Sequence, residues 1–393
     1  MGRQGNWLER HSKKLLFLLV VLIIGGMALV TEKILAYRAQ PNIYYPGIKR
    51  YVKLRESRPL YSDVIIPPQN TMDISDTLVQ KGYRFRVDEN GFIMPSKIHA
   101  NPQLTLVFLG GSTTECSYVE EENRFPYLVG RLLEKKTGLR TDSYNAAKGG
   151  NTSLHSLDAL LNKVIPVKPD VAIMMHNVND LAVLLFEKTF WTKNPYRSPL
   201  VEIKPSFKTA MKNVEESFHI MRDLYIPHLS RQLKNFYHYV VGNKFNVDEF
   251  KQARGSKIQV DKHRLVSEFS MNLQMFIDIS RARKITPALM TMANRLKDHP
   301  DPFILSLERT TVETGTGLNY KDFKDLVYLF NQTIREVAAA NSVLVIDLDR
   351  KVPKEKELMY DFVHFNDAGS KYVSDIIAAE LYPVVNSLKT QHH

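Results

Sequence analysis

The chain alternates between short runs that are mostly apolar and longer stretches in which apolar residues recur every three or four positions. A short continuous apolar run bounded by glycine or asparagine is typical of a strand buried on both faces. Apolar residues at three- and four-residue spacing indicate an amphipathic helix instead. Five strands are therefore predicted, at 104–110, 140–144, 170–175, 285–292 and 342–347.

Amphipathic helices are expected between these strands. They are predicted at 123–133, 154–164, 265–279, 320–340 and after Asn366. Gly138 should end the first of them, and the last should be capped by Asn366 and stopped by Pro383. The helix at 154–164 has one apolar face, which consists of Leu154, Leu157, Leu160, Leu161 and Val164. Strands that alternate with helices imply right-handed crossovers and a parallel sheet with helices on both faces. The predicted class is a three-layer α/β fold.

The N-terminal part has a different pattern. Residues 15–30 contain no charged side chain, and Arg3, Arg10, Lys13 and Lys14 precede them. This pattern predicts a transmembrane anchor at 15–31, a cytoplasmic tail at 1–14 and a single pass through the inner (cytoplasmic) membrane. The rest of the chain is then expected to be periplasmic or extracellular. A cleaved signal peptide is the alternative, although no clean cleavage site follows.

Composition and charge narrow the classes of function. The 393 residues are 44% hydrophobic and 24% charged, as in an ordinary globular protein. The formal net charge of +11 would allow an acidic partner, but the basic residues are scattered and no nucleic-acid-binding motif is present, so we expect no nucleic acid. Cys116 is the only cysteine, which excludes an intrachain disulfide and a cysteine-rich metal site. We expect it to be a small structural residue rather than a thiol nucleophile.

The remaining chain divides by composition. Prolines break the segment 32–101, which is expected to be an extended approach segment, and residues 83–91 within it predict an edge hairpin. The main domain is expected at 102–383, with a short tail at 384–393. An insertion at about 181–263 interrupts the alternation of strands and helices.

The insertion is rich in aromatic residues, and it follows directly after a polar strand end. It could lie over the active-site crevice and stack on sugars, or it could be a helical subdomain that packs its own aromatics. The aromatics are Phe186, Phe190, Trp191, Tyr196, Tyr225, Phe236, Tyr237 and Tyr239.

The first strand ends at Gly110-Gly111 and presents Ser112. Two glycines allow a tight turn that leaves the next side chain uncrowded, so Ser112 is the candidate nucleophile. The alternative is that Ser112 or Thr113 only caps the next helix.

Asp361 and His364 lie three residues apart before the last helix. A serine hydroxyl needs a base to take its proton, and a carboxylate that orients the base makes it more effective. Both residues could instead be ordinary residues of a helix start. His176, which follows the third strand, is interpreted as a packed residue and not as a catalyst.

Three motifs follow the first three predicted strands: Gly110-Gly-Ser-Thr-Thr, Asn145-Ala-Ala-x-Gly-Gly-x-Thr-Ser, and Asn-x-Asn-Asp ending at Asp180. A fourth, Asp361-x-x-His, precedes the last helix. In combination they resemble the SGNH/GDSL hydrolase superfamily over residues 103–383, apart from the insertion. The resemblance implies a flavodoxin-like sheet with strand order 2-1-3-4-5. It also implies that Ser112 is the nucleophile, that the Ser112 amide, Gly150 and Asn179 form the oxyanion hole, and that Asp361 and His364 are orienter and base.

The function predicted from the site and the anchor is a membrane-anchored serine esterase that removes O-acetyl groups from an extracytoplasmic glycan. No cofactor and no metal are expected. One alternative is an O-acetyltransferase that passes the same acyl group to a polysaccharide, and another is an anchored, non-catalytic module that binds a glycan or an assembly partner. An α/β-hydrolase elbow is disfavoured because the second elbow glycine is missing, and a phosphate-binding loop because no Walker lysine follows.

Overall fold

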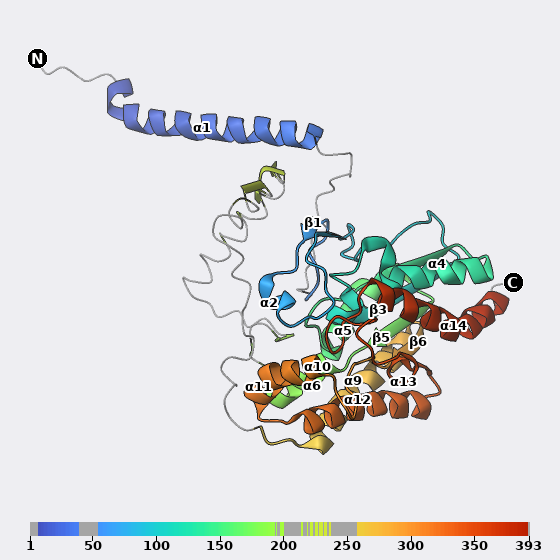
Figure 1. Cartoon of the computed structure of the whole chain (residues 1–393). Coiled ribbons are helices and arrows are strands. Elements are labelled where there is room, and N and C mark those ends of the chain that lie inside the picture. The colour runs from blue at the N-terminus through green and yellow to red at the C-terminus, as the bar shows by residue number, and fades with distance from the viewer. Residues whose placement is uncertain are drawn as a thin grey trace, which may run out of the picture. The chain divides into compact units, whose positions relative to one another are not determined.

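The computed structural model describes residues 7–38, 54–192 and 258–391, together with scattered residues between 194 and 236 (Figure 1). The chain forms two compact units. The smaller unit combines Met1–Pro46 with Glu202–Asn246, and the larger unit combines Gly47–Val201 with Val247–His393. All the predicted strands and candidate site residues belong to the larger unit.

The larger unit is built on a five-stranded sheet in which every neighbouring pair is parallel. The spatial order is β4-β3-β5-β6-β7, which confirms the expected order 2-1-3-4-5 of the main sheet. The strands are β3 (Leu104–Gly110), β4 (Thr141–Asn145), β5 (Val171–Met175), β6 (Thr286–Met290) and β7 (Leu344–Ile346).

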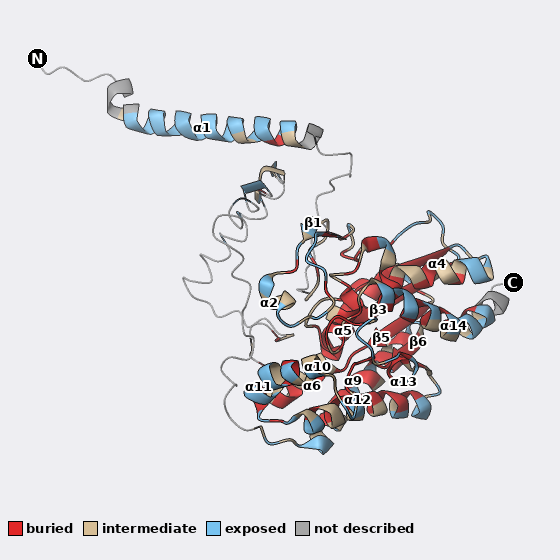
Figure 2. Ribbon diagram, viewed as in Figure 1, coloured by how far each residue is buried: buried red, intermediate tan, exposed pale blue. Residues whose placement is uncertain are grey.

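Two hydrophobic cores lie on opposite faces of this sheet. Because side chains alternate along a strand, Val107 and Leu109 of β3 enter one core, whereas Leu106 and Phe108 enter the other. Figure 2 shows that β3, β5 and β6 are largely buried between these two cores. The first core is covered by α5 (Ser153–Ala159), α6 (Val178–Phe186), α9 (Lys262–Ala282) and α12 (Tyr320–Ala340), and the second by α4 (Phe125–Thr137) and α14 (Asp367–Gln391).

Two predicted helix ends agree with the structure. Gly138 ends α4 in the left-handed conformation (φ 74°), which glycine adopts without steric cost. Asn319 caps α12 by accepting the N–H of Asp322 at 2.9 Å, so the helix has the predicted bounds. The other described helices of the larger unit are short: α2 (Gln69–Met72), α3 (Ser112–Glu115), α10 (Pro302–Glu308), α11 (Thr314–Thr316), α13 (Leu348–Lys351), the 3₁₀ turns η1 (Glu121–Asn123) and η3 (Ile165–Val167), and the π-helical turns η2 (Leu160–Val164) and η4 (Arg309–Glu313).

Two helix predictions were wrong. Pro383 does not stop the last helix, because α14 continues to Gln391 and buries Val385 in the second core, so residues 384–391 are no separate tail. This packing offsets the helix-breaking effect of a proline, which is about 3 kcal/mol. Leu161 was expected on the buried face of its helix but is 48% exposed. It lies in the π-helical turn η2, whose wider turn shifts the buried face.

The approach segment is described from residue 54, and residues 39–53 of this predicted segment lie outside the described residues. Its two strands, β1 (Ser62–Ile65) and β2 (Tyr83–Arg86), pair antiparallel in a separate small sheet. The predicted hairpin is therefore only partly correct, because β2 pairs with the preceding strand. After the turn, the N–H of Ile93 donates to the carbonyl of Asn145 at 2.9 Å, which joins this segment to the edge of β4.

The N-terminal helix α1 runs from Trp7 to Arg38. Within it, Lys13–Leu35 has a mean hydropathy of 2.5 over an 18-residue window and is long and apolar enough to cross a bilayer, a property that a signal sequence would share.

The aromatic insertion at 181–263 lies largely outside the described residues, including Tyr196, Tyr237 and Tyr239. Phe190 is buried in the first core, as expected for a packing residue. Trp191, Tyr225 and Phe236 are each more than half exposed, so the packing expected of them is not observed.

Candidate active site

Ser112 stands at the point where the central strand β3 turns into α3. Gly111 precedes it in an extended conformation, and the carbonyl of Gly111 accepts the N–H groups of Thr114 (3.1 Å) and Glu115 (2.9 Å). A Cβ at Gly111 would lie 2.5 Å from Asn179 Nδ2, and one at Gly110 would collide with the side chain of Thr114. The turn therefore requires both glycines, and it brings Ser112 beside the loop that follows β5.

Asp361 and His364 lie in the loop between α13 and α14, after the last strand β7. Asp361 Oδ1 accepts the N–H groups of Val363 and His364, each at 2.8 Å, so the carboxylate is fixed by its own loop. Asp361 Oδ2 lies 2.6 Å from His364 Nδ1. With Nδ1–H donating to this carboxylate, Nε2 of the neutral ring is left as an acceptor.

Ser112 Oγ lies 2.7 Å from His364 Nε2, so the structure joins Ser112, His364 and Asp361 in one hydrogen-bonded chain. Tyr360 stacks on the His364 ring with a centroid separation of 5.5 Å and an interplanar angle of 5°. Burial lowers the pKa of His364, whereas the charge and hydrogen bond of Asp361 and, to a smaller extent, the charge of Glu115 raise it. The raising effects together outweigh burial, so the pKa lies above its ordinary value. This arrangement can transfer a proton from the hydroxyl to the imidazole.

The predicted oxyanion-hole residues Gly150 and Asn179 lie in the segments that follow β4 and β5, beside the serine turn. Gly150 has φ 75°, which favours glycine, and a Cβ on the adjacent Gly149 would be 3.8 Å from Ser112 Cβ. Asn179 lies in the first turn of α6, and its Nδ2 donates to the carbonyl of Asn151 at 3.0 Å. The amide of Asn179 is thus held against Gly111, next to Ser112.

Glu115 is a supporting residue to which the sequence analysis assigned no role. Its buried carboxylate accepts the N–H of Gly149 at 2.9 Å and pairs with Lys148 Nζ at 2.9 Å. It therefore ties the loop of Gly150 to the helix that begins with Ser112. Its position three residues after Ser112, on the same short helix, is the only signal in the sequence.

Three further residues support the same loops and were also missed. Arg55 of the approach segment donates to the carbonyl of Gly149 (2.9 Å) and to Asn151 Oδ1 (3.1 Å), and Arg197 donates to the carbonyl of Gly150. The carboxylate of Asp180 accepts the N–H of Ser153 at 2.9 Å and joins the loop after β4 to the loop after β5. Burial raises the pKa of Asp180 to about 7. No sequence motif links Arg55 or Arg197 to the glycines.

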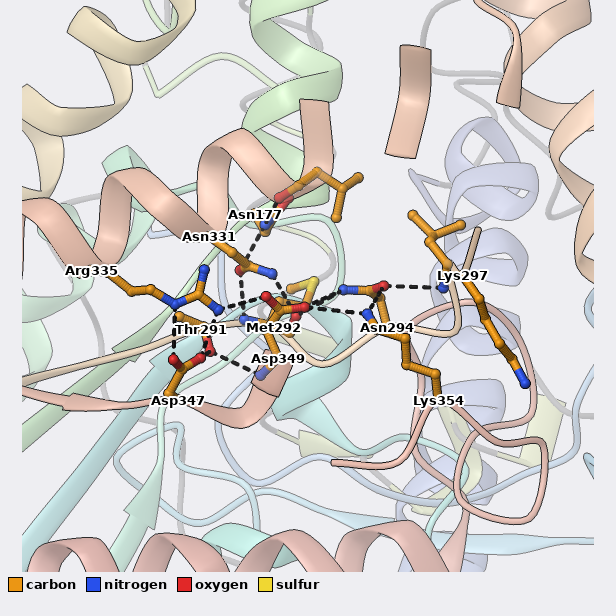
Figure 3. A network of polar contacts seen from close by, with 12 residues as sticks. Asn177, Thr291, Met292, Asn294, Lys297, Asn331, Arg335, Asp347, Asp349 and Lys354 are labelled. Atoms are coloured by element: carbon orange, nitrogen blue, oxygen red, sulfur yellow. Dashed lines mark hydrogen bonds and ion pairs between the residues drawn. The ribbon is translucent and has the colours of Figure 1, made fainter. Parts of the chain in front are cut away.

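Asn177 does not belong to this site. Its Nδ2 donates to Asn331 Oδ1 at 2.9 Å and to the carbonyl of Val327 at 3.0 Å, both on α12. Figure 3 shows Asn331 between Asn177 and the backbone of Met292, with Arg335 reaching Asp347 and Asp349 in the same network. These contacts fasten α12 to the loops after β5, β6 and β7.

The other singled-out residues are structural. His176 is buried and lies 2.7 Å from Ser156 Oγ, as expected for a packed residue, and burial lowers its pKa to about 3. Cys116 is buried at the end of α3, and burial raises the pKa of its thiol to about 12, which keeps it protonated at neutral pH. Among the described residues, no group of three or more His, Cys, Asp or Glu could hold a metal ion.

The sequence matches no protein-family model and no curated protein. It is similar in structure to the acetyl xylan esterase AlAXEase, with 16% identity and a TM-score of 0.40 over 70% of this chain and 98% of that one. It is also similar to the acetylxylan esterase Axe2 from Geobacillus stearothermophilus, with 14% identity and a TM-score of 0.41 over 72% of this chain and 96% of that one. A lipase/acylhydrolase from Enterococcus faecalis is similar as well, with 15% identity and a TM-score of 0.39 over 72% of this chain and 96% of that one. At such scores the likeness does not bear on what this chain binds or acts on.

Proposed function

We propose that this chain is a membrane-anchored serine esterase of the SGNH/GDSL type. The observation that carries the proposal is the hydrogen-bonded chain from Ser112 Oγ through His364 to Asp361, with separations of 2.7 and 2.6 Å. A serine, a histidine and a carboxylate in this order and geometry are the groups that an acyl transfer through an acyl-serine intermediate requires.

In the first half of the reaction, Ser112 Oγ attacks the carbonyl carbon of the ester while its proton passes to His364 Nε2. Asp361 holds the ring by its Nδ1–H and stabilises the imidazolium that forms. The C–O bond to the alcohol then breaks, and His364 Nε2 gives its proton to the departing oxygen. The acyl group remains on Ser112.

In the second half, a water molecule loses a proton to His364 Nε2 and attacks the carbonyl carbon of the acyl-serine. The bond from this carbon to Ser112 Oγ then breaks, and His364 Nε2 returns the proton to Oγ, which releases the carboxylic acid and restores Ser112. Negative charge develops on the carbonyl oxygen in both halves. The N–H groups of Ser112 and Gly150 and the amide of Asn179 are the proposed donors to it. Removal of one such donor from an enzyme typically costs about 2.7–4 kcal/mol of transition-state stabilisation.

The proposed substrate is an O-acylated, most simply O-acetylated, glycan outside the cytoplasm. Two features support this choice. The basic residues before the apolar part of α1 favour a cytoplasmic N-terminus, which would put the larger unit on the other side of the membrane. The aromatic residues that follow α6, such as the exposed Trp191, have faces on which sugar rings can stack.

The test is turnover of p-nitrophenyl acetate and of acetylated xylo-oligosaccharides by the purified full-length chain in detergent, with released acetate measured. Labelling by a fluorophosphonate should accompany activity. Ser112→Ala should abolish both, because no other described hydroxyl is hydrogen-bonded to His364 Nε2. Thr113→Ala is the matched control and should keep both.

The same assay separates the proposed esterase from the alternatives. Acetate that appears on an added oligosaccharide instead of in solution would identify an acyltransferase that uses the same serine. If Ser112→Ala changed neither turnover nor labelling on any ester, the proposal would be wrong and a glycan- or partner-binding module would remain.

A further inference from the structure

The described helical residues between 214 and 236 carry a row of exposed, large apolar side chains. Val214, Phe218, Met221 and Tyr225 are spaced by four, three and four residues and are 58–66% exposed. This spacing puts them on one side of a helix. Leu233 and Phe236 continue the row after Pro227, and we call these six residues the apolar stripe.

Two backbone hydrogen bonds among the described residues have the four-residue span of an α-helix. Ile226 N–H donates to the carbonyl of Arg222 at 2.8 Å, and Ser230 N–H donates to the carbonyl of Ile226 at 2.9 Å. A row of large apolar side chains in contact with water is unfavourable, and contiguous exposed apolar patches mark surfaces that contact a partner or a membrane. We therefore expect the apolar stripe to be covered by a partner or by lipid.

The apolar helix α1 fixes where this stripe lies, because both belong to the smaller unit. Glu32 directly follows the apolar residues Leu29 and Val30 and the polar Thr31. Glu32 is 8% exposed, and its carboxylate accepts the N–H of Leu229 at 2.8 Å and lies 3.8 Å from His228 Nε2. If α1 crosses a bilayer, a carboxylate that directly follows its uncharged part belongs at the level of the lipid headgroups. Residues 228 and 229 are then held at that level.

The charge of the surrounding sequence fits a lipid surface. Residues 202–246 contain seven Lys and Arg against four Asp and Glu. An excess of basic residues next to an apolar face is typical of helices that lie in the interface of a membrane with anionic lipids. The same net charge on two copies would oppose their association through this face.

We propose that the six residues of the apolar stripe lie in the membrane interface, among the acyl chains, and that Glu32 sets their depth. The proposal rests on the proposed membrane anchor and goes beyond it. The chain would then contact the bilayer through a spanning helix and, about 200 residues later, through an interfacial helix.

The test uses the full-length chain in liposomes of phosphatidylethanolamine and phosphatidylglycerol, with a nitrobenzoxadiazole probe on one introduced cysteine. Cys116 is buried with a raised thiol pKa, so a maleimide at neutral pH labels the introduced cysteine. Met221→Cys places the probe on the apolar stripe, and Phe236→Cys is a second, independent position on it. Met271→Cys on α9, 49% exposed, is the matched control in the larger unit.

Probes at 221 and 236 should be quenched severalfold more by lipids spin-labelled at acyl carbon 5 than the probe at 271. Aqueous iodide should give the reverse order. Equal quenching by iodide at all three positions would overturn the proposal, as would protection at 221 and 236 from both quenchers, which would place the stripe against protein.

A probe at Val20→Cys in α1 separates this inference from the anchor on which it rests. It should be quenched by lipids spin-labelled at acyl carbon 12. If it is not, the spanning helix itself is contradicted, whereas failure at 221 and 236 with quenching at 20 contradicts only the interfacial helix.

Discussion

Ser112 Oγ and His364 Nε2 are 2.7 Å apart, although 252 residues separate them in the chain. The start of α14, which follows His364, is tied to the segment after Ser112. Asp367 Oδ1 accepts hydrogen bonds from the backbone N–H of Glu120 at 3.0 Å and from the side-chain amide Nδ2 of Asn123 at 2.9 Å. Ser370 Oγ donates to the carbonyl of Asn123 at 2.7 Å. These bonds hold the histidine loop against the serine turn.

The activity should depend on the protonation of His364. The ring must be neutral to accept the proton of Ser112, and its pKa lies above the ordinary value of 6.5, because Asp361 outweighs the effect of burial. We therefore expect kcat/KM to rise with pH through a midpoint above 6.5. Asp361→Asn removes the raising charge and leaves burial, so the midpoint should move to lower pH while kcat falls steeply. A pH–rate profile of both proteins checks this, and an unchanged midpoint would contradict it.

Asn179 and Asn177 should differ in what they affect. Asn179→Ala removes a proposed oxyanion donor and should lower turnover about 10²–10³-fold with little change in Tm. Asn177→Ala leaves the carbonyl of Val327 and the amide of Asn331 with fewer partners, and should lower the free energy of unfolding by about 1–3 kcal/mol with a smaller effect on turnover. Kinetics and thermal unfolding of the two variants make the comparison. The reverse order in turnover would exclude Asn179 from the oxyanion hole.

Glu115 should act through the loop of Gly150. Glu115→Ala frees the N–H of Gly149 and leaves Lys148 without this carboxylate, so the loop should lose its position beside Ser112. We expect kcat to fall about tenfold, which corresponds to about 1.4 kcal/mol, with KM nearly unchanged. Glu115→Gln keeps an acceptor oxygen for Gly149 and should recover part of kcat. Equal kcat in the wild type and both variants would show that the hydrogen bond between Glu115 and Gly149 does not affect turnover.

Gly369 should be intolerant of any side chain. A Cβ at this position would collide with the carbonyl oxygen of Leu358, in the segment that leads to Asp361. Gly369→Ala should therefore destabilise the fold by about 1–3 kcal/mol and lower kcat as the loop shifts. Ala368→Ser, an exposed neighbour in the same turn, should change neither the Tm nor kcat. A wild-type Tm for Gly369→Ala would contradict the packing of α14 against this loop.

The topology can be tested in cells. If α1 spans the membrane with its N-terminus in the cytoplasm, protease added to spheroplasts should digest the larger unit without lysis. A cytoplasmic protein should survive as the control. Protection of the larger unit until lysis would reverse the assignment of sides.

The sequence by itself determined the five strands of the main sheet and the presence of α4, α5, α9, α12 and α14, because amphipathic helices and buried strands have local periodic signals. The range of α12 was predicted without error, since Asn319 caps it and its apolar residues recur at helical spacing. The order of the five strands followed from the resemblance to a known family. The separation of Ser112, Asp361 and His364 in the chain was no obstacle, because parallel strands bring their carboxyl ends to one edge.

Only the tertiary structure decided which distant groups support the site. Arg55 and Glu115 reach the glycine loop after β4, and Asn177 faces α12 instead of Ser112. The same holds for Pro383, whose helix continues because Val385 is buried beyond it. Local patterns report the conformation of a segment and which of its faces is apolar. The partner of a polar side chain, and the packing that outweighs a helix breaker, depend on residues far away in the chain, which no local pattern encodes.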